Sequence, residues 1–395
     1  MKDKIKVAQF VDSYLPITDG VAMVVNNYAS ILTNHNQDCT VFAPKKGDNP
    51  GRVVNYDIVR CSGFHVKAIG YDCPTPAFDS KLKKQLMAAD FDIFHAHSPF
   101  TMGQYAIKIA RKRNVPIIGT FHSQYKEDFK KYLKSDMLTD FMVRYIVRFY
   151  NSVDKVWAVS HGAADILREY GCTQDIEVMI NGTDLTYLAN PEEIKRQVNA
   201  AYNLDSNETV LLFVGRLVSQ KNIFMMADSL KLLLSQGQKF RMIIAGVGAD
   251  QEKLKNKIKE LGIEDRVIFA GAIDGRENLA KLFMRADLFV FPSLYDTSGL
   301  VKIEAASQKT ASVLVENTCA AEEVIDGENG FICSNTAESL AAKITEALSD
   351  RQKLSRVAEK AYETLYFSWD DIVTMAERKY KEAIKGHKSR FPVKK

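Results

Sequence analysis

Residues 241–254 read RMIIAGVGADQEKL, an apolar run followed by a glycine loop and the start of a helical pattern. The run is continuous rather than alternating, which is typical of a parallel strand covered on both faces. Gly246 and Gly248 permit close backbone approach to a ligand, although tight packing between strand and helix explains them equally well. Gln251 stands where a dinucleotide-binding fingerprint has its third glycine. The stretch therefore predicts one strand–loop–helix unit of an α/β protein.

The same alternation of apolar runs and helical patterns recurs along the whole chain. Other runs rich in Val, Ile and Phe lie at 6–10, 39–43, 91–96, 116–121, 155–159, 210–215, 266–271, 287–292 and 312–316. Helical patterns lie between them at 101–113, 137–152, 222–236, 250–261 and 337–348. Alternating strands and helices predict doubly wound parallel sheets, with ligands outside the carboxyl ends of the strands.

A polar stretch at 186–208 with few strand formers separates two series of predicted strands. A chain of 395 residues has room for two or three domains. We expect one Rossmann-like domain at 1–185 with 369–390, and a second at 186–368. The two sheets would face each other across a cleft, and the helix expected over 369–386 would return to the first domain.

Composition excludes several classes of protein. The chain is 46% hydrophobic and 26% charged, which suits a folded protein with a sizeable core. A net charge of +4 is too small to indicate a nucleic-acid partner. The six cysteines are scattered without metal-ligand spacing, so we expect reduced thiols and no metal site. No apolar run reaches the roughly 20 residues of a membrane span, and MKDKIKVAQF lacks signal-peptide features, so we expect a cytoplasmic location.

Two cations follow the predicted strand at 210–215. The stretch VGRLVSQKN (214–222) places Arg216 and Lys221 between that strand and the next helix. Arginine binds phosphate oxygens bidentately and lysine acts as a point charge, so the pair suits a diphosphate. A solvated basic turn is the alternative interpretation.

A second candidate site lies in FPSLYDTSGLVKIEAAS (291–307). A turn leads into a helix whose first backbone N–H groups we expect to be free for phosphate or polarised hydroxyls. Asp296 precedes this turn, and Glu304 lies about one helical turn beyond it, where it would accept hydrogen bonds from ribose hydroxyls. An ordinary capped surface helix would give the same spacing.

In this order, VGRLVSQKN, the glycine loop, the Asp296–Glu304 spacing and EEVIDGENGF (322–331) resemble the donor-binding half of family 4 glycosyltransferases. These are retaining enzymes of the GT-B fold that use nucleotide sugars. FVDSYLPITDGVAMVVNNYASIL (10–32), FDIFHAHSP (91–99), GTFHSQY (119–125), AVSHGAADIL (158–167) and INGTD (180–184) resemble the other half. Within the family, the chain is most similar to enzymes that glucosylate diacylglycerol.

The resemblance implies a role for each matching residue on the donor side. Arg216 and Lys221 would hold the diphosphate, Glu304 the ribose, and Asp296 the donor-sugar hydroxyls. Gly246 and Gly248 would approach the donor, and the backbone of Ser298, Gly299 and Leu300 would contact its sugar and phosphate. From the other domain, Gly20 would approach the donor, and His122 would lie close to the anomeric carbon. His95 and His97 either line the cleft or only pack and form hydrogen bonds.

Three departures from the family pattern bear on which sugar is transferred. Asp296 replaces the usual Glu and is one methylene shorter, and Ser298 replaces a usual Phe. Cys319-Ala320-Ala321 stands where a Gly-Gly pair is common.

Residues 101–150 are predicted to face a membrane. They hold ten Lys and Arg against four acidic residues, with aromatic and aliphatic residues between them. A basic amphipathic segment can bind an anionic membrane surface, whereas a solvated helix over an ordinary core stripe is the alternative. We expect the acceptor-side contacts at Lys126, Lys130, Lys131 and Lys134.

The resemblance implies transfer of a hexose, favoured as glucose from UDP-glucose, to an acceptor hydroxyl, favoured as that of diacylglycerol. No tightly bound cofactor and no metal would be required, because protein cations balance the diphosphate charge. The enzyme would lie peripherally on the cytoplasmic face of a membrane. A soluble sugar, a polyprenyl-linked saccharide or a protein as acceptor remains an alternative, as does a non-catalytic subunit that binds nucleotide sugars.

Overall fold

A computed structural model describes residues 4–16, 19–45, 53–66 and 71–390 of the chain. They form two compact units: unit 1 is Met1–Asn181 with Trp369–Lys395, and unit 2 is Gly182–Ser368. The boundary falls four residues before the expected position at 185. Leu185 lies in the hydrophobic core of unit 2, and Thr183 pairs with Ser368, so this short segment is held by unit 2.

The described part of unit 1 is built on one parallel sheet of seven strands. In spatial order these are β3 (Asp57–Cys61), β2 (Asp38–Pro44), β1 (Lys6–Phe10), β6 (Ile93–Ala96), β7 (Ile117–Phe121), β8 (Lys155–Ala158) and β9 (Ile176–Val178). A separate antiparallel pair is formed by β4 (Gly63–Val66) and β5 (Tyr71–Pro74). The helices are α1 (Gly20–Asn34), α2 (Ser80–Ala88), α3 (Thr101–Arg113), α4 (Tyr125–Leu133), α5 (Asp136–Tyr150), α6 (His161–Glu169) and α14 (Trp369–Arg390).

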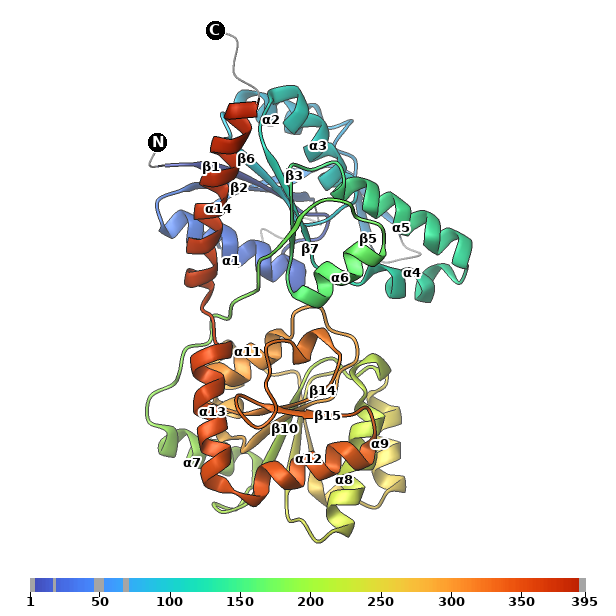
Figure 1. Ribbon diagram of the computed structural model, residues 1–395, viewed down its shortest axis with the longest axis vertical. Helices are drawn as coiled ribbons and strands as arrows, with labels where there is room; N and C mark the ends of the chain where they lie inside the picture. Colours follow the sequence, from blue (N-terminus) through green and yellow to red (C-terminus); the bar gives the residue numbers. More distant parts are fainter. Residues whose placement is uncertain (1–3, 17–18, 46–52, 67–70, 391–395) are drawn as a thin grey trace. The chain divides into compact units, whose positions relative to one another are not determined.

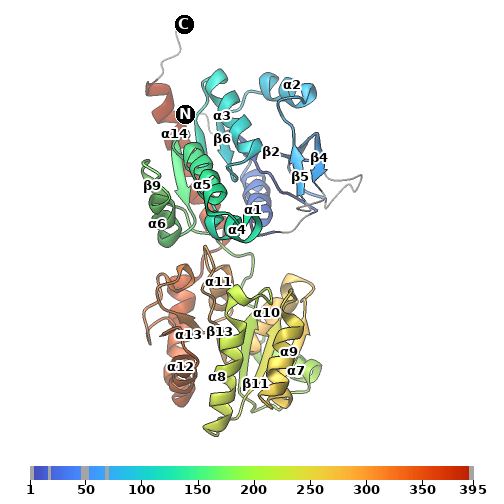
Figure 2. The ribbon, with the colours of Figure 1, turned by 90° about the vertical axis from the view of Figure 1, so that its right-hand side faces the viewer.

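Unit 2 is built on a second parallel sheet. Its strands, in spatial order, are β12 (Val267–Gly271), β11 (Arg241–Ala245), β10 (Val210–Val214), β13 (Leu288–Phe291), β14 (Ser312–Val315) and β15 (Phe331–Cys333). Its helices are α7 (Pro191–Tyr202), α8 (Ile223–Ser235), α9 (Gln251–Glu260), α10 (Arg276–Arg285), α11 (Leu300–Ser307), α12 (Ala337–Ser349) and α13 (Arg351–Leu365). Short 3₁₀ turns are η1 (Ser219–Lys221), η2 (Glu264–Arg266) and η3 (Cys319–Ala321). Helices lie on both sides of β11 and β13 (Figure 2).

The apolar runs become strands because both faces of each sheet are covered. Every residue of β13 and β14 is buried, whereas the edge strand β12 is only half-buried along its length. A continuous apolar run suits the first environment, since neither face of a covered parallel strand meets water. All ten predicted runs are confirmed as strands.

Helix α14 returns to unit 1, as expected, and packs beside α1 (Figure 1). Ile372, Val373 and Ala376 are fully buried. Tyr380 is also fully buried and stacks on Trp157 of β8, with ring centroids 5.5 Å apart. The last helix of the chain therefore contributes to the core of the first unit.

Each sheet has one point where the strand order reverses. In unit 2 the chain fills one side from β10 to β12 and then crosses to β13, so the reversal lies between β10 and β13. In unit 1 it lies between β1 and β6. Loops on either side of such a reversal diverge and leave a crevice at the carboxyl ends of the strands, where ligands bind in α/β proteins. Among the predicted site residues, Gly20 follows β1, Arg216 and Lys221 follow β10, and Asp296 follows β13, whereas His122 follows β7 and Gly246 and Gly248 follow β11.

Candidate functional site

The loops after β10 and β13 in unit 2 bring a lysine and an aspartate together. Lys221 Nζ donates to Asp296 Oδ2 over 2.7 Å and to the carbonyl oxygen of Tyr295 over 3.1 Å. Burial opposes ionisation of Asp296, but the Lys221 ammonium and two backbone N–H groups outweigh it and hold the pKa of this carboxyl below its usual value. These two bonds use two of the three N–H donors of the Lys221 ammonium.

The turn that follows Asp296 is closed by the side chain of Asp296 itself. Asp296 Oδ1 accepts hydrogen bonds from the backbone N–H groups of Gly299 over 2.8 Å and Ser298 over 3.2 Å. Asp296 thus occupies two N–H groups that precede the helix, whereas the expectation for the first N–H groups of the helix itself, from Leu300 onward, stays a prediction. An aspartate side chain is short enough to bond to backbone two and three residues ahead, which a glutamate does less readily. Helix α11 then begins at Leu300, after Gly299 in the left-handed region at φ +58°.

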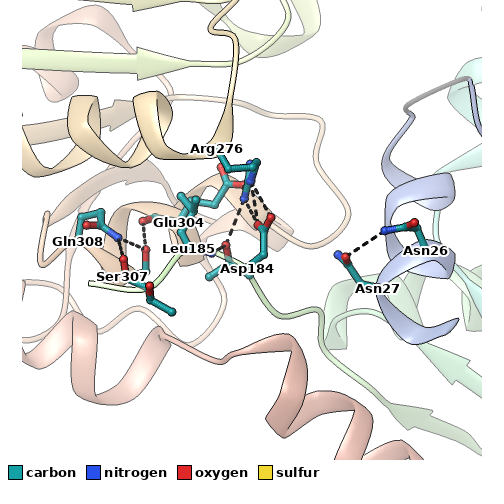
Figure 3. Close-up of polar contacts among 10 residues, drawn as sticks. Asn26, Asn27, Asp184, Leu185, Arg276, Glu304, Ser307 and Gln308 are labelled. Carbon is teal, nitrogen blue, oxygen red and sulfur yellow. Dashed lines mark hydrogen bonds and ion pairs between the residues drawn. The ribbon is translucent and has the colours of Figure 1, made fainter. Parts of the chain in front are cut away.

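Glu304 on α11 belongs to a charged network that includes two residues with no role assigned from the sequence (Figure 3). Arg276 Nη2 lies 2.7 Å from Glu304 Oε1, and Arg276 Nε donates to Asp184 Oδ1 over 2.8 Å. Burial raises the pKa of Glu304, and the Arg276 guanidinium opposes that rise. Asp184 lies within the INGTD motif, whereas Arg276 lies in no motif and is brought to Glu304 only by the fold.

Arg216 and the two glycines of the 246–248 loop occupy neighbouring loops. Arg216 is exposed and forms no ion pair within the described residues. A Cβ atom on Gly246 would lie 1.9 Å from the carbonyl oxygen of Gly215, and one on Gly248 would lie 2.3 Å from that of Leu217. These glycines are thus required for packing against the loop that carries Arg216, so they position that loop whether or not they touch a ligand.

In unit 1, His122 follows β7 and His97 follows β6, next to the reversal point. His97 Nδ1 lies 3.1 Å from His122 Nε2. Burial lowers the pKa of His122 to about 3, so its imidazole is neutral at physiological pH. His95 and His97 are fully buried and carry hydrogen bonds, which agrees with the packing interpretation of these two residues.

Gly20 is the first residue of α1, and the side chain of Asp19 caps that helix by accepting from the N–H of Ala22 over 2.8 Å. Gly20 is exposed, and a Cβ atom there would meet no described atom within 4 Å. Packing therefore gives no reason for a glycine here, and its approach to the donor stays a prediction.

Helices α4 and α5 carry exposed apolar side chains beside basic ones. We call this region the α4–α5 surface and define its apolar part as Tyr132, Leu133, Met137, Leu138 and Phe141, which are between 37% and 76% exposed. Of the predicted lysines, Lys130 and Lys134 are exposed, Lys126 is half-buried, and the side chain of Lys131 lies outside the described atoms. The surface is both apolar and basic, as a membrane-binding segment requires.

Within the described residues, no helix is both long and apolar enough to cross a membrane. The same part of the chain holds no group of three or more His, Cys, Asp or Glu residues placed to bind a metal ion.

Comparison with known proteins identifies relatives over nearly the whole chain. Residues 18–187 match the family described as Glycosyltransferase Family 4, and residues 194–364 match Glycosyl transferases group 1. The alpha-monoglucosyldiacylglycerol synthase of Streptococcus pneumoniae is 28% identical over 370 residues, which span 91% of this chain and 82% of that protein.

Solved structures with very different sequences share the fold. Sucrose-phosphate synthase from Thermosynechococcus elongatus superposes with a TM-score of 0.78 at 19% identity, over 97% of this chain and 100% of its own. HepE from Anabaena in complex with UDP-glucose gives a TM-score of 0.75 at 18% identity, over 96% and 100% of the two chains.

Two Rossmann-like units with the last helix returned to the first define the GT-B fold, which confirms the predicted fold class. The chain belongs to the glycosyltransferases, with a family 4 first half and a group 1 second half. The resemblance inferred from its motifs is thereby confirmed.

Proposed function

We propose that this protein transfers glucose from UDP-glucose to the hydroxyl of a membrane lipid such as diacylglycerol, with retention of the anomeric configuration. The observation that carries the donor part is the grouping at one reversal point of two cations and a carboxylate. Arg216 and Lys221 follow β10, and Glu304 lies on the helix after β13, the strand paired with β10. Cations suit the diphosphate, and a carboxylate suits the ribose hydroxyls.

The donor sugar is favoured as glucose because a neighbour of the same fold is known in complex with UDP-glucose. The lipid acceptor is favoured by the name of the Streptococcus pneumoniae relative and by the α4–α5 surface. The enzyme would bind the cytoplasmic face of a membrane through that surface.

The proposed reaction is a front-face substitution. The bond between the anomeric carbon and the diphosphate oxygen breaks while the acceptor oxygen bonds to that carbon on the same face, and the leaving phosphate takes the acceptor proton. Arg216 and Lys221 stabilise the charge that develops on the diphosphate, assisted by the helix dipole at Leu300. The scheme needs no metal ion, because side-chain cations supply the positive charge.

A screen of donors and acceptors with product detection by mass spectrometry tests the proposal. UDP-glucose with diacylglycerol vesicles is expected to give a glucosylated lipid, and NMR of that product is expected to show the α-linkage of the donor. A product formed only with soluble sugars would reject the lipid acceptor. If no combination of donor and acceptor gives turnover, the result would favour a non-catalytic subunit that binds nucleotide sugars.

Flotation with anionic liposomes at low salt tests the membrane surface separately. Changing Lys126, Lys130, Lys131 and Lys134 to Glu is expected to abolish flotation, since each basic residue near such a surface contributes about 1 kcal/mol. UDP binding in solution should be unchanged. A matched control reverses four lysines on unit 2: Lys231, Lys253, Lys255 and Lys259. Equal flotation of wild type and the α4–α5 variant would remove the membrane role of this surface.

A further inference from the structure

Three histidines from neighbouring strands form a buried chain in unit 1. His95 on β6 bonds through its two ring nitrogens to Tyr380 Oη and Thr120 Oγ1, each at 2.6 Å. His97 bonds through Nδ1 to His122 Nε2 at 3.1 Å, and these two rings stack with centroids 5.3 Å apart. His97 is fully buried, and in the described part of the chain its Nε2 has no hydrogen-bond partner. Among the ring nitrogens of these three histidines, only His97 Nε2 and His122 Nδ1 therefore lack a hydrogen bond to a described residue.

The unpartnered nitrogen indicates which ring donates the bond between His97 and His122. Burial keeps both imidazoles neutral, so each has one N–H and one bare nitrogen. If His122 Nε2 donated, the proton of His97 would sit on its Nε2, and a buried N–H group would have no acceptor. Either arrangement leaves one ring N–H without a described partner, but His97 is 0% exposed whereas His122 is 8% exposed, and orphaned N–H groups in full burial are rarer than unpaired acceptors. The favoured arrangement therefore has His97 Nδ1–H donating to a bare His122 Nε2.

The proton of His122 then resides on Nδ1, which bonds to no described residue. We propose that His97 is a positioning residue that fixes His122 in this tautomer. His122 therefore presents a hydrogen-bond donor to a ligand oxygen, such as a hydroxyl of the donor sugar. It offers no bare nitrogen there that could act as a base. The inference rests on the proposed glycosyl transfer, in which the leaving phosphate, and not a histidine, takes the acceptor proton.

Nitrogen-15 NMR of the full chain, labelled at histidine, reads the tautomer directly, because protonated and bare ring nitrogens differ strongly in chemical shift. A His122→Gln variant assigns the signals of His122. The expected result is a protonated Nδ1 and a bare Nε2 for His122 at pH 7. A protonated Nε2, or a doubly protonated ring, would overturn the inference. This measurement needs no donor or acceptor, so it stands even if the proposed function fails.

A pair of variants that match in shape tests the consequence for activity. In His97→Asn, the side-chain amide can still donate to His122, whereas in His97→Asp the carboxylate can only accept and forces the opposite tautomer. We expect kcat/KM of the Asn variant within about fivefold of wild type and that of the Asp variant lower by on the order of 10²-fold, as for one lost preorganised donor. UDP affinity should be the same in both.

Equal kcat/KM of the two folded variants would overturn the positioning role, and if the Asp variant does not fold, the tautomer measured in wild type decides. Absence of glucosyl transfer by wild type would reject the proposed function and leave the tautomer result intact.

Discussion

The two units place polar groups at their reversal points in different ways. Unit 1 buries neutral imidazoles: His95 and His97 are fully buried, and each ring nitrogen of His95, His97 and His122 forms at most one hydrogen bond to a described residue. Unit 2 holds ions in pairs, with Lys221 on Asp296 and Arg276 on Glu304. A neutral ring tolerates complete burial at the cost of one unpaired nitrogen, whereas a buried charge requires a counter-charge. Under the proposed function, the neutral rings of unit 1 would orient a ligand and the cations of unit 2 would balance its charge.

Removing the cations of unit 2 should have the largest effect. Lys221→Ala and Arg216→Ala are each expected to lower turnover by on the order of 10²–10³, the effect of losing one preorganised group that stabilises charge. Steady-state rates with the donor and acceptor identified by the screen measure this, with Lys253→Ala on the surface of α9 as control. Near-normal kcat in both variants would contradict the proposal that Arg216 and Lys221 bind the donor diphosphate.

Folding stability should separate these same two variants. Lys221→Ala leaves Asp296 partly buried without its cation, and we expect a loss of up to about 3 kcal/mol, the lower end for a broken buried pair. Arg216→Ala should cost almost nothing, because the side chain is exposed. Urea unfolding measures both. The double variant Lys221→Ala with Asp296→Asn should recover most of the loss, and failure to recover would mean that the pair is not the cause.

Removing Arg276 should change how donor affinity depends on pH. Burial already raises the pKa of Glu304, and Arg276→Leu would raise it further, so the carboxylate needed for the ribose is lost at a higher pH. We expect UDP to bind roughly tenfold more weakly near pH 6, equivalent to about 1.4 kcal/mol, with the difference shrinking as pH rises. Calorimetric titrations from pH 5 to 8 test this. An offset that does not vary with pH would point to direct contact between Arg276 and the donor.

The smallest effect is expected from removing His35, which contacts two carboxylates in the N-terminal part of α14. His35 Nδ1 lies 2.7 Å from Glu377 Oε1, and its Nε2 lies 2.9 Å from Asp370 Oδ1. Burial lowers the pKa of His35, but the two carboxylates prevail and raise it. The stabilisation is therefore complete below the unfolded pKa of about 6.5 and is lost as pH rises through the raised folded value.

The Tm difference between wild type and His35→Gln should accordingly be largest near pH 5.5 and fall toward zero in alkaline buffer. Partly exposed pairs of this kind contribute about 0.2–1 kcal/mol, so a shift of at most a few degrees is expected, roughly 2–4 °C per kcal/mol. A Tm difference that grows with pH would contradict the stabilising role of the His35 contacts with Glu377 and Asp370.

Sequence patterns predicted the central strands of both parallel sheets but missed their strands β3, β9 and β15, as well as the separate pair β4 and β5. The missed strands are short or lie at sheet edges, where partial exposure allows polar residues into the pattern, as in DIVRC of β3. The motif residues Arg216, Lys221, Asp296 and Glu304 could be named because they follow apolar runs. Arg276 could not, since it opens an ordinary amphipathic helix that no local signal marks.

The amino-acid sequence by itself determined the alternation of strands and helices, the family and the residues of its motifs, because each depends on neighbours within one strand, loop or helix. Tertiary structure alone decided which groups pair. Asp296 bonds to the backbone of its own turn and to Lys221. Arg276 contacts Glu304, which lies 28 positions away in the sequence, and His97 contacts His122, which lies 25 positions away. The physical reason is that electrostatic and hydrogen-bond partners are chosen by distance in space, and parallel strand order brings together carboxyl ends that lie far apart along the chain.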